Sequence, residues 1–111
     1  MSTVVPSAGS NRRMFRHVVL LTFTEGTTKA QQDAVLAGLE SLPGQIPEIR
    51  SYHFGLDAGI ADGNASLAVV AEFEDQAGYQ AYATNAVHLK VIAETIKPVL
   101  AARSAVQFED N

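Results

Sequence analysis

The segment Phe15–Phe23 constrains the fold more than any other part of the chain, because it is rich in β-branched and aromatic residues and predicts a strand that is apolar on both faces. One face carries alternate residues from Phe15 onward, and the other carries Val18 and Leu20. A strand with one solvated face alternates apolar and polar residues. We therefore expect both faces of the sheet that contains this strand to be covered.

The next segments predict a helix and two more strands. A helix is expected from about Thr28 to Leu42, ended by Pro43-Gly44, with Ala34, Val35, Leu39 and Leu42 facing inward. A second strand over residues 49–56 is expected to place Arg50, Tyr52, Phe54 and Leu56 on one face and Ile49, Ser51, His53 and Gly55 on the other. Residues 57–64 predict a loop, and residues 66–73 predict a third strand that is again apolar on both faces.

The last third of the chain predicts helical segments and a closing strand. Asp75 is expected to cap a short helix that ends near Thr84. A longer helix follows from about Val87, with Leu89, Ile92, Ile96 and Val99 or Leu100 inward, and Pro98 is expected to kink or restart it. Residues 104–109 predict a short strand.

The order strand, helix, strand, strand, helix, strand is the ferredoxin-like βαββαβ plan of the α+β class, with a four-stranded antiparallel sheet and both helices on one face. The other face of the sheet would then be bare. Strands that are apolar on both sides predict a second sheet against it, most simply from an identical chain related by a two-fold axis. We therefore expect a homodimer.

Composition narrows the partners and the chemistry. The formal net charge of −4 argues against nucleic acid or an anionic membrane as the main ligand. The absence of cysteine excludes disulfides, thiolate nucleophiles and Cys-ligated metal centres. Residues 1–13 mix Ser, Gly, Pro and Asn and predict a disordered arm before a domain over 14–111. Because no segment resembles a secretory signal or a membrane span, we expect a cytoplasmic protein.

Three side chains are candidates for proton chemistry without a cofactor or metal. His17 lies on the first strand, His88 opens the second long helix, and Tyr82 precedes it by six residues. If His17 faces the helices it can approach His88, and two imidazoles with a phenol can move protons near pH 7. Two alternatives remain open: His17 can be a hydrogen-bonded residue of the core, and His88 can face solvent at the start of its helix. His53 is interpreted as structural or interfacial, and Tyr79 as a packing residue.

Other patterns are weak or missing. The sequence contains no HExxH, glycine-rich phosphate loop, GxSxG or EF-hand motif. Acidic residues at strand and loop ends give only a weak metal signal, because such side chains are usually solvated; they are Asp57, Asp62, Glu72, Glu74 and Asp75.

Taken together and in order, four segments resemble the stress-responsive A/B barrel (Dabb) family. They are residues 15–23, the Leu42-Pro-Gly-Gln-Ile-Pro-Glu-Ile49 turn, the Tyr52-His-Phe-Gly-Leu-Asp57 strand, and the Tyr82…His88 helix entry. The resemblance covers about 14–109. It implies a ferredoxin-like chain that dimerises into an α+β barrel, with a pocket between sheet and helices. Relatives of known activity include a polyketide cyclase, whose paired histidines and phenol are similar in position to His17, His88 and Tyr82, and a hydroxynitrile lyase.

Two departures accompany the resemblance. Asn85-Ala86 stands where the family often has His-Pro, and Leu39 stands where the cyclase has a tyrosine in its pocket. Three functions stay open. The first is a dimer that binds a small hydrophobic or aromatic molecule without an assigned reaction. The second is a cofactor-free lyase or cyclase with His88 as base, and the third is a monooxygenase-like enzyme acting on phenols.

Overall fold

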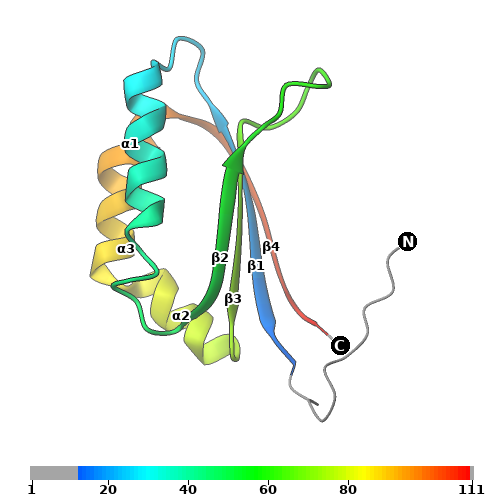
Figure 1. Cartoon of the computed structure of the whole chain (residues 1–111), viewed down its shortest axis with the longest axis vertical. Helices are drawn as coiled ribbons and strands as arrows, with labels where there is room; N and C mark the ends of the chain where they lie inside the picture. Colours follow the sequence, from blue (N-terminus) through cyan, green and yellow to red (C-terminus); the bar gives the residue numbers. More distant parts are fainter. Residues whose placement is uncertain (1–12, 111) are drawn as a thin grey trace.

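A computed structural model describes residues 13–110, so most of the predicted arm over 1–13 lies outside the described residues. The chain forms one four-stranded sheet in the order β2-β3-β1-β4, with antiparallel neighbours throughout. The helices cover one face of this sheet (Figure 1), which confirms the ferredoxin-like plan. The elements are β1 (Phe15–Phe23), α1 (Lys29–Glu40), β2 (Ile49–Leu56), β3 (Leu67–Phe73), α2 (Gln76–Thr84), α3 (Ala86–Val91), η1 (Ile92–Ile96), η2 (Lys97–Val99) and β4 (Leu100–Glu109).

β1 is apolar on both faces, as its composition predicts. On the face toward the helices, His17, Val19 and Leu21 are buried. The face away from the helices, called the free face below, carries Val18, Leu20, Val70, Val106 and Phe108 from β1, β3 and β4. Leu20 is 43% exposed there, so the described residues leave this apolar surface largely uncovered.

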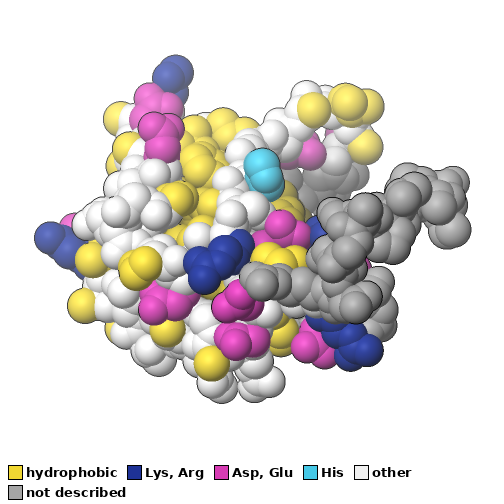
Figure 2. Space-filling view, turned by 60° about the horizontal axis from the view of Figure 1, so that its bottom comes forward, with side chains coloured by type: hydrophobic (Ala, Val, Ile, Leu, Met, Phe, Trp, Pro, Cys, Tyr) yellow, Lys and Arg dark blue, Asp and Glu magenta, His cyan; other side chains and the backbone are white. Residues whose placement is uncertain are grey.

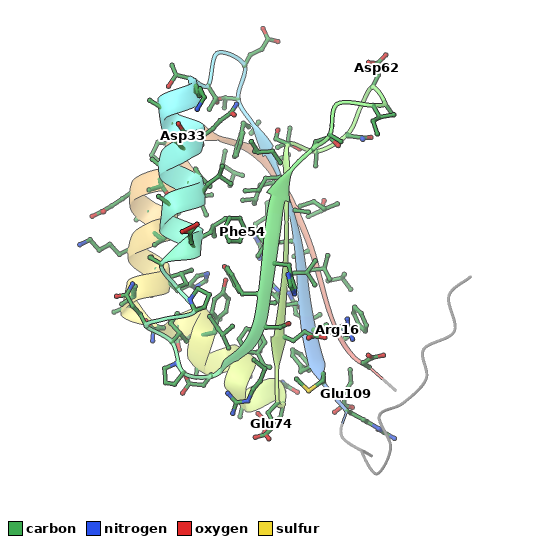
Figure 3. The ribbon with its side chains drawn as sticks, in the orientation of Figure 1. Arg16, Asp33, Phe54, Asp62, Glu74 and Glu109 are labelled. Carbon is green, nitrogen blue, oxygen red and sulfur yellow. The ribbon has the colours of Figure 1, made fainter. Side chains whose placement is uncertain are left out.

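A charged network borders the free face near the end of the chain. Arg16 Nη2 lies 2.9 Å from Glu72 Oε2 and 2.8 Å from Asp110 Oδ2. Ser51 Oγ donates a hydrogen bond of 2.6 Å to the other oxygen of Glu72. Figure 3 shows Arg16 on this side of the sheet, whereas Phe54 points from β2 toward α1.

The loop over residues 57–66 leans to the side of the sheet that the helices leave open (Figure 1). Its apolar side chains stand out from the surface at the upper right of Figure 2. Ile60, in this loop, is 89% exposed. The loop therefore extends the apolar surface at one end of the free face.

α1 begins and packs largely as expected. Thr28 caps it through a capping box in which Thr28 Oγ1 accepts from Gln31 N and the Gln31 side chain accepts from Thr28 N. Val35 and Leu39 are buried, but the inward position predicted for Ala34 is wrong, because the buried stripe at spacings of three and four leaves Ala34 exposed. Gly38 packs against α3 so closely that an added Cβ would lie 2.8 Å from Val91 Cγ1.

The helical region after Asn85 differs from the single kinked helix that the sequence predicts. α3 ends at Val91 and continues as the π-helical turn η1 and the 3₁₀ turn η2. Leu89 is 50% exposed instead of inward, whereas Ile96 and Val99 are buried. Pro98 lies within η2, the helical path ends at Val99, and β4 begins at Leu100, four residues earlier than predicted.

A bulge in β2 corrects the predicted face of Ile49. Ile49 pairs with Phe73 and Ser51 pairs with Glu72, so Arg50 is an extra residue with no partner of its own. The bulge moves Ile49 to the helix-facing side, where it packs against the core beside Tyr52 and Phe54. Within residues 13–110, no helix is long and apolar enough to span a bilayer.

Candidate functional site

A cavity of about 340 Å³ lies between the sheet and the helices. Its walls come from all four strands and from every helical segment. Most of its lining is apolar, with a few polar side chains that converge on the same space. The lining residues are His17, Val19, Leu21, Leu39, Tyr52, Val69, Tyr79, Tyr82, Ala83, His88, Ile92, Ile96, Lys97, Leu100 and Arg103.

His17 reaches this cavity from the middle of β1 and is 4% exposed. Gln107, its partner in the register of β4, places Nε2 at 2.8 Å from His17 Nδ1. An amide nitrogen can only donate, so Nδ1 accepts and the ring proton resides on Nε2. Burial, with smaller contributions from Arg103 and His88, lowers the pKa of His17 from 6.5 to about 4. His17 is therefore a neutral hydrogen-bond donor at pH 7.

His88 has the opposite tautomer. The cap at Asn85, whose Oδ1 accepts from Val87 N, starts α3 and positions this side chain. His88 Nδ1 lies 3.3 Å from the carbonyl oxygen of Ala83, and a carbonyl can only accept, so Nδ1 carries the proton. Burial lowers the pKa of His88, and Arg103 lowers it further. Nε2 of His88 therefore holds a lone pair that can accept a proton.

Tyr82 lies against both imidazoles. Its ring centroid is 4.1 Å from that of His88 and 6.1 Å from that of His17. The hydroxyls of Tyr82 and Tyr52 are 3.0 Å apart. Burial raises the pKa of both phenols, so both stay protonated near neutral pH. One hydroxyl donates to the other, and the accepting hydroxyl keeps its own proton for a further hydrogen bond.

The structure thus brings His17, His88 and Tyr82 to one cavity, while their catalytic role stays a prediction. Tyr79 both packs and lines the cavity, with its ring 4.8 Å from that of His17 and 5.6 Å from that of Phe15. His53 is exposed on the free face and takes no part in the cavity.

Three of the acidic residues with a weak metal signal have structural roles in separate parts of the fold. Glu72 pairs with Arg16, Asp57 accepts from Gly59 N, and Asp75 caps α2. In the part of the chain that the structure describes, no group of three or more His, Asp or Glu side chains is placed to hold a metal ion.

Sequence reasoning missed three polar residues of the cavity: Tyr52, Lys97 and Arg103. The sequence places Tyr52 in the correct strand. Because Tyr52 and Phe54 occupy alternate positions, they share a face, and this pattern could have indicated that Tyr52 faces the helices. Arg103 was missed because the predicted strand began one residue later. In the observed register Arg103 lies opposite Leu21, on the face that Gln107 shares with His17.

Comparison with known proteins identifies the family. The model of the stress-responsive A/B barrel domain matches residues 15–110. The chain belongs to this family. A stress-response A/B barrel domain-containing protein of Arabidopsis thaliana is 32% identical to the chain over 82 residues, which are 71% of each protein. A curated relative therefore carries the same domain name. This Dabb domain has no assigned reaction.

Solved structures resemble the Dabb domain over most of its length. A dimeric ferredoxin-like protein of unknown function from Thermobifida fusca has 39% identity and a TM-score of 0.80, over 88% of this chain and 92% of that one. The hydroxynitrile lyase of Passiflora edulis has a TM-score of 0.77 at 19% identity, over 88% of this chain and 94% of that one. At that identity the second likeness shows a shared fold alone.

The buried imidazoles make the stability of the Dabb domain depend on pH. Between pH 6.5 and about 4 the unfolded chain protonates at His17, whereas the folded chain does not. The free energy of unfolding should therefore fall as the pH drops through this window, by up to about 3 kcal/mol from His17. Urea denaturation at pH 7.0, 5.5 and 4.5 measures this slope. His17→Gln should flatten it, and equal slopes in both proteins would contradict the assignment.

Proposed function

We propose that this Dabb domain protein is a homodimer that binds a small apolar ring compound carrying an oxygen substituent. The observation that supports the proposal most directly is the cavity itself. It has apolar walls and a small set of converging polar groups, the arrangement typical of small-molecule sites.

The apolar and the polar side chains of the cavity would contact different parts of the ligand. Val19, Leu21, Val69, Ile92 and Ile96 offer an apolar surface from which a ring compound displaces water. The polar groups offer complementary hydrogen bonds: His17 Nε2–H and a phenol hydroxyl donate, and His88 Nε2 accepts. A hydroxyl or carbonyl oxygen on the ligand would satisfy groups that are otherwise poorly solvated.

The free face supports the homodimer. Leu20, Val106 and Phe108 are each between 43% and 53% exposed on one continuous sheet surface. Burying a mid-sized apolar side chain contributes roughly 1.5–3 kcal/mol, so a few such residues from each chain would offset the cost of association. The solved structure from Thermobifida fusca, at 39% identity, is described as dimeric.

Cofactor-free acid–base catalysis is a second candidate function, favoured by the opposite tautomers of the two histidines. His88 Nε2 would remove the proton of a substrate hydroxyl, while His17 Nε2–H or the Tyr82 hydroxyl would hold the same oxygen. Cleavage of a hydroxynitrile fits this arrangement: the hydroxyl loses its proton to His88, the bond to the nitrile carbon breaks, a carbonyl forms and cyanide leaves.

The binding function predicts that 2-naphthol stabilises the folded protein. At a hundred times its Kd a ligand stabilises the native state by about 2.7 kcal/mol, which raises the Tm of a domain of this size by several degrees. Val69→Phe places a larger ring in the cavity and should abolish the shift. Leu89→Phe, on the exposed side of α3, should retain it. A shift of equal size in the Val69→Phe protein would place the ligand elsewhere.

The dimer is tested at the centre of the free face. Leu20→Asp adds a charge to the proposed interface, and we expect sedimentation velocity to show a folded monomer at micromolar concentration, whereas the wild type is a dimer. Leu89→Asp makes the same change on the helix layer and should leave the dimer intact. A wild-type protein that sediments as a stable folded monomer would refute the homodimer.

If the domain catalyses acid–base cleavage, the wild type should release cyanide from an aromatic hydroxynitrile. His88→Gln should then lower kcat at least about tenfold, because general base catalysis contributes roughly 10²–10⁴-fold. Lys90→Gln, exposed two residues further along α3, is the control and should keep the wild-type rate. An unchanged rate in His88→Gln removes His88 from the mechanism. No release by the wild type removes the lyase candidate and leaves the binding function standing.

A further inference from the structure

We propose that the ligand of the cavity is an organic anion, an aromatic or alicyclic carboxylate whose carboxylate pairs with Arg103, assisted by Lys97. The inference rests on the proposed function, because it specifies the chemical class of the molecule that the cavity binds. Four observations support it: the charge of the lining, the lack of an ion-pair partner for Arg103 among residues 13–110, the shape of the site around Arg103, and the neutrality of the histidines.

The charge of the cavity is opposite to that of the chain. The chain carries 12 acidic and 8 basic residues, with a formal net charge of −4. The cavity lining contains Lys97 and Arg103 and no Asp or Glu. A concave, largely apolar site with two cationic side chains and no acidic one concentrates positive potential where a ligand would lie. That potential favours an anion in a protein that otherwise repels anions.

Neither cation has an ion-pair partner among the residues that the structure describes. The ion pairs among residues 13–110 involve Arg13, Arg16 and Lys29, and none includes Arg103 or Lys97. The guanidinium of Arg103 also forms no hydrogen bond with other groups in that part of the chain. A guanidinium carries five donors in a fixed planar fork that matches a carboxylate, so Arg103 is available for a two-point contact with a ligand.

The position of Arg103 on β4 leaves it accessible from the cavity. β4 is exposed from Ala101 to Glu109, and the neighbour of Arg103 on the helix-facing side of the strand, Ala105, ends in a single methyl group. Arg103 is nevertheless close enough to shift the pKa of both His17 and His88 downward. The guanidinium therefore lies at the exposed side of the cavity and within electrostatic range of its polar centre.

Lys97 and Arg103 carry the permanent positive charge of the cavity, because the histidines are neutral. His17 and His88 are both held neutral near pH 7, so neither imidazole supplies an ion-pair partner for a carboxylate. The Nε2–H of His17 supplies a further hydrogen bond to an anionic oxygen. The ring of the ligand would occupy the apolar wall formed by Val69, Ile92 and Ile96.

Two probes of nearly the same shape test the charge. The full-length protein is titrated by calorimetry with 2-naphthoate and with the neutral 2-naphthamide at pH 7.5. We expect 2-naphthoate to bind at least about tenfold more tightly, the effect of a charge-assisted hydrogen-bonded pair. Arg103→Gln should reduce this preference to about twofold or less while 2-naphthamide binds as before. Lys29→Gln, which removes an exposed cation of α1, should keep the full preference.

The outcomes separate the anion proposal from the proposed function. Equal affinities for the two probes in the wild type, or a full preference retained in Arg103→Gln, would overturn the anion proposal while binding of 2-naphthamide still supports the cavity as a ligand site. Tight binding of 2-naphthoate that survives Val69→Phe would place the anion outside the cavity and also overturn it. If neither probe binds to the wild type and 2-naphthol produces no thermal shift, the proposed function itself fails.

Discussion

The hydrogen-bonded position of β1 between β3 and β4 determines the rest of the structure. Because both edges of β1 are paired, its side chains cannot change face, and the register sends His17, Val19 and Leu21 toward the helices. The same register sends Val18 and Leu20 to the free face. One strand therefore supplies both a floor for the cavity and the centre of an apolar surface on the other side of the sheet.

The cavity exists because the helix layer does not cover the sheet uniformly. Side chains of β1 and β3 that face the helices are buried, whereas β4 is exposed over most of its length. The helical path after Asn85 widens in the π-helical turn η1 and then tightens in the 3₁₀ turn η2 before β4 begins at Leu100. A π-helical turn often occurs at functional sites, and here two of its residues, Ile92 and Ile96, line the cavity. The open side of the cavity is the side that carries Arg103.

Strong local signals made much of this fold predictable from the sequence. Runs of β-branched, aliphatic and aromatic residues located β1 and β3, and the side chains of Thr28 and Asp75 marked the starts of α1 and α2. The predictions were wrong where tertiary packing, and not the local sequence, determines the structure. The bulge at Arg50, which moves Ile49 into the core, depends on pairing with β3 and leaves no pattern in β2 alone. Leu89 is exposed because the side chains of this region that line the cavity are His88, Ile92 and Ile96, four residues apart, and Leu89 lies outside that stripe.

The candidate site was predictable to the same degree. His17, His88 and Tyr82 stood out because polar groups are unusual beside apolar segments. Arg103 did not, because an arginine in a weakly patterned segment resembles a solvated surface charge until the register of β4 is known. The interaction of Gln107 with His17 depends on that register as well. The sequence thus singled out His17, His88 and Tyr82, whereas the places of Arg103 and Gln107 became clear only from the pairing of β4 with β1.

The electrostatics of the site couple binding to proton affinity. Burial and the nearby charge of Arg103 both lower the pKa of His17 and His88, so the two histidines are weak bases. An anion paired with Arg103 would offset that charge and, lying near the imidazoles, would favour their protonated forms. By linkage, the proton and the anion would then each strengthen the binding of the other. A base that gains proton affinity only when the cavity is occupied is better suited to act on a bound anionic molecule than on bulk solvent.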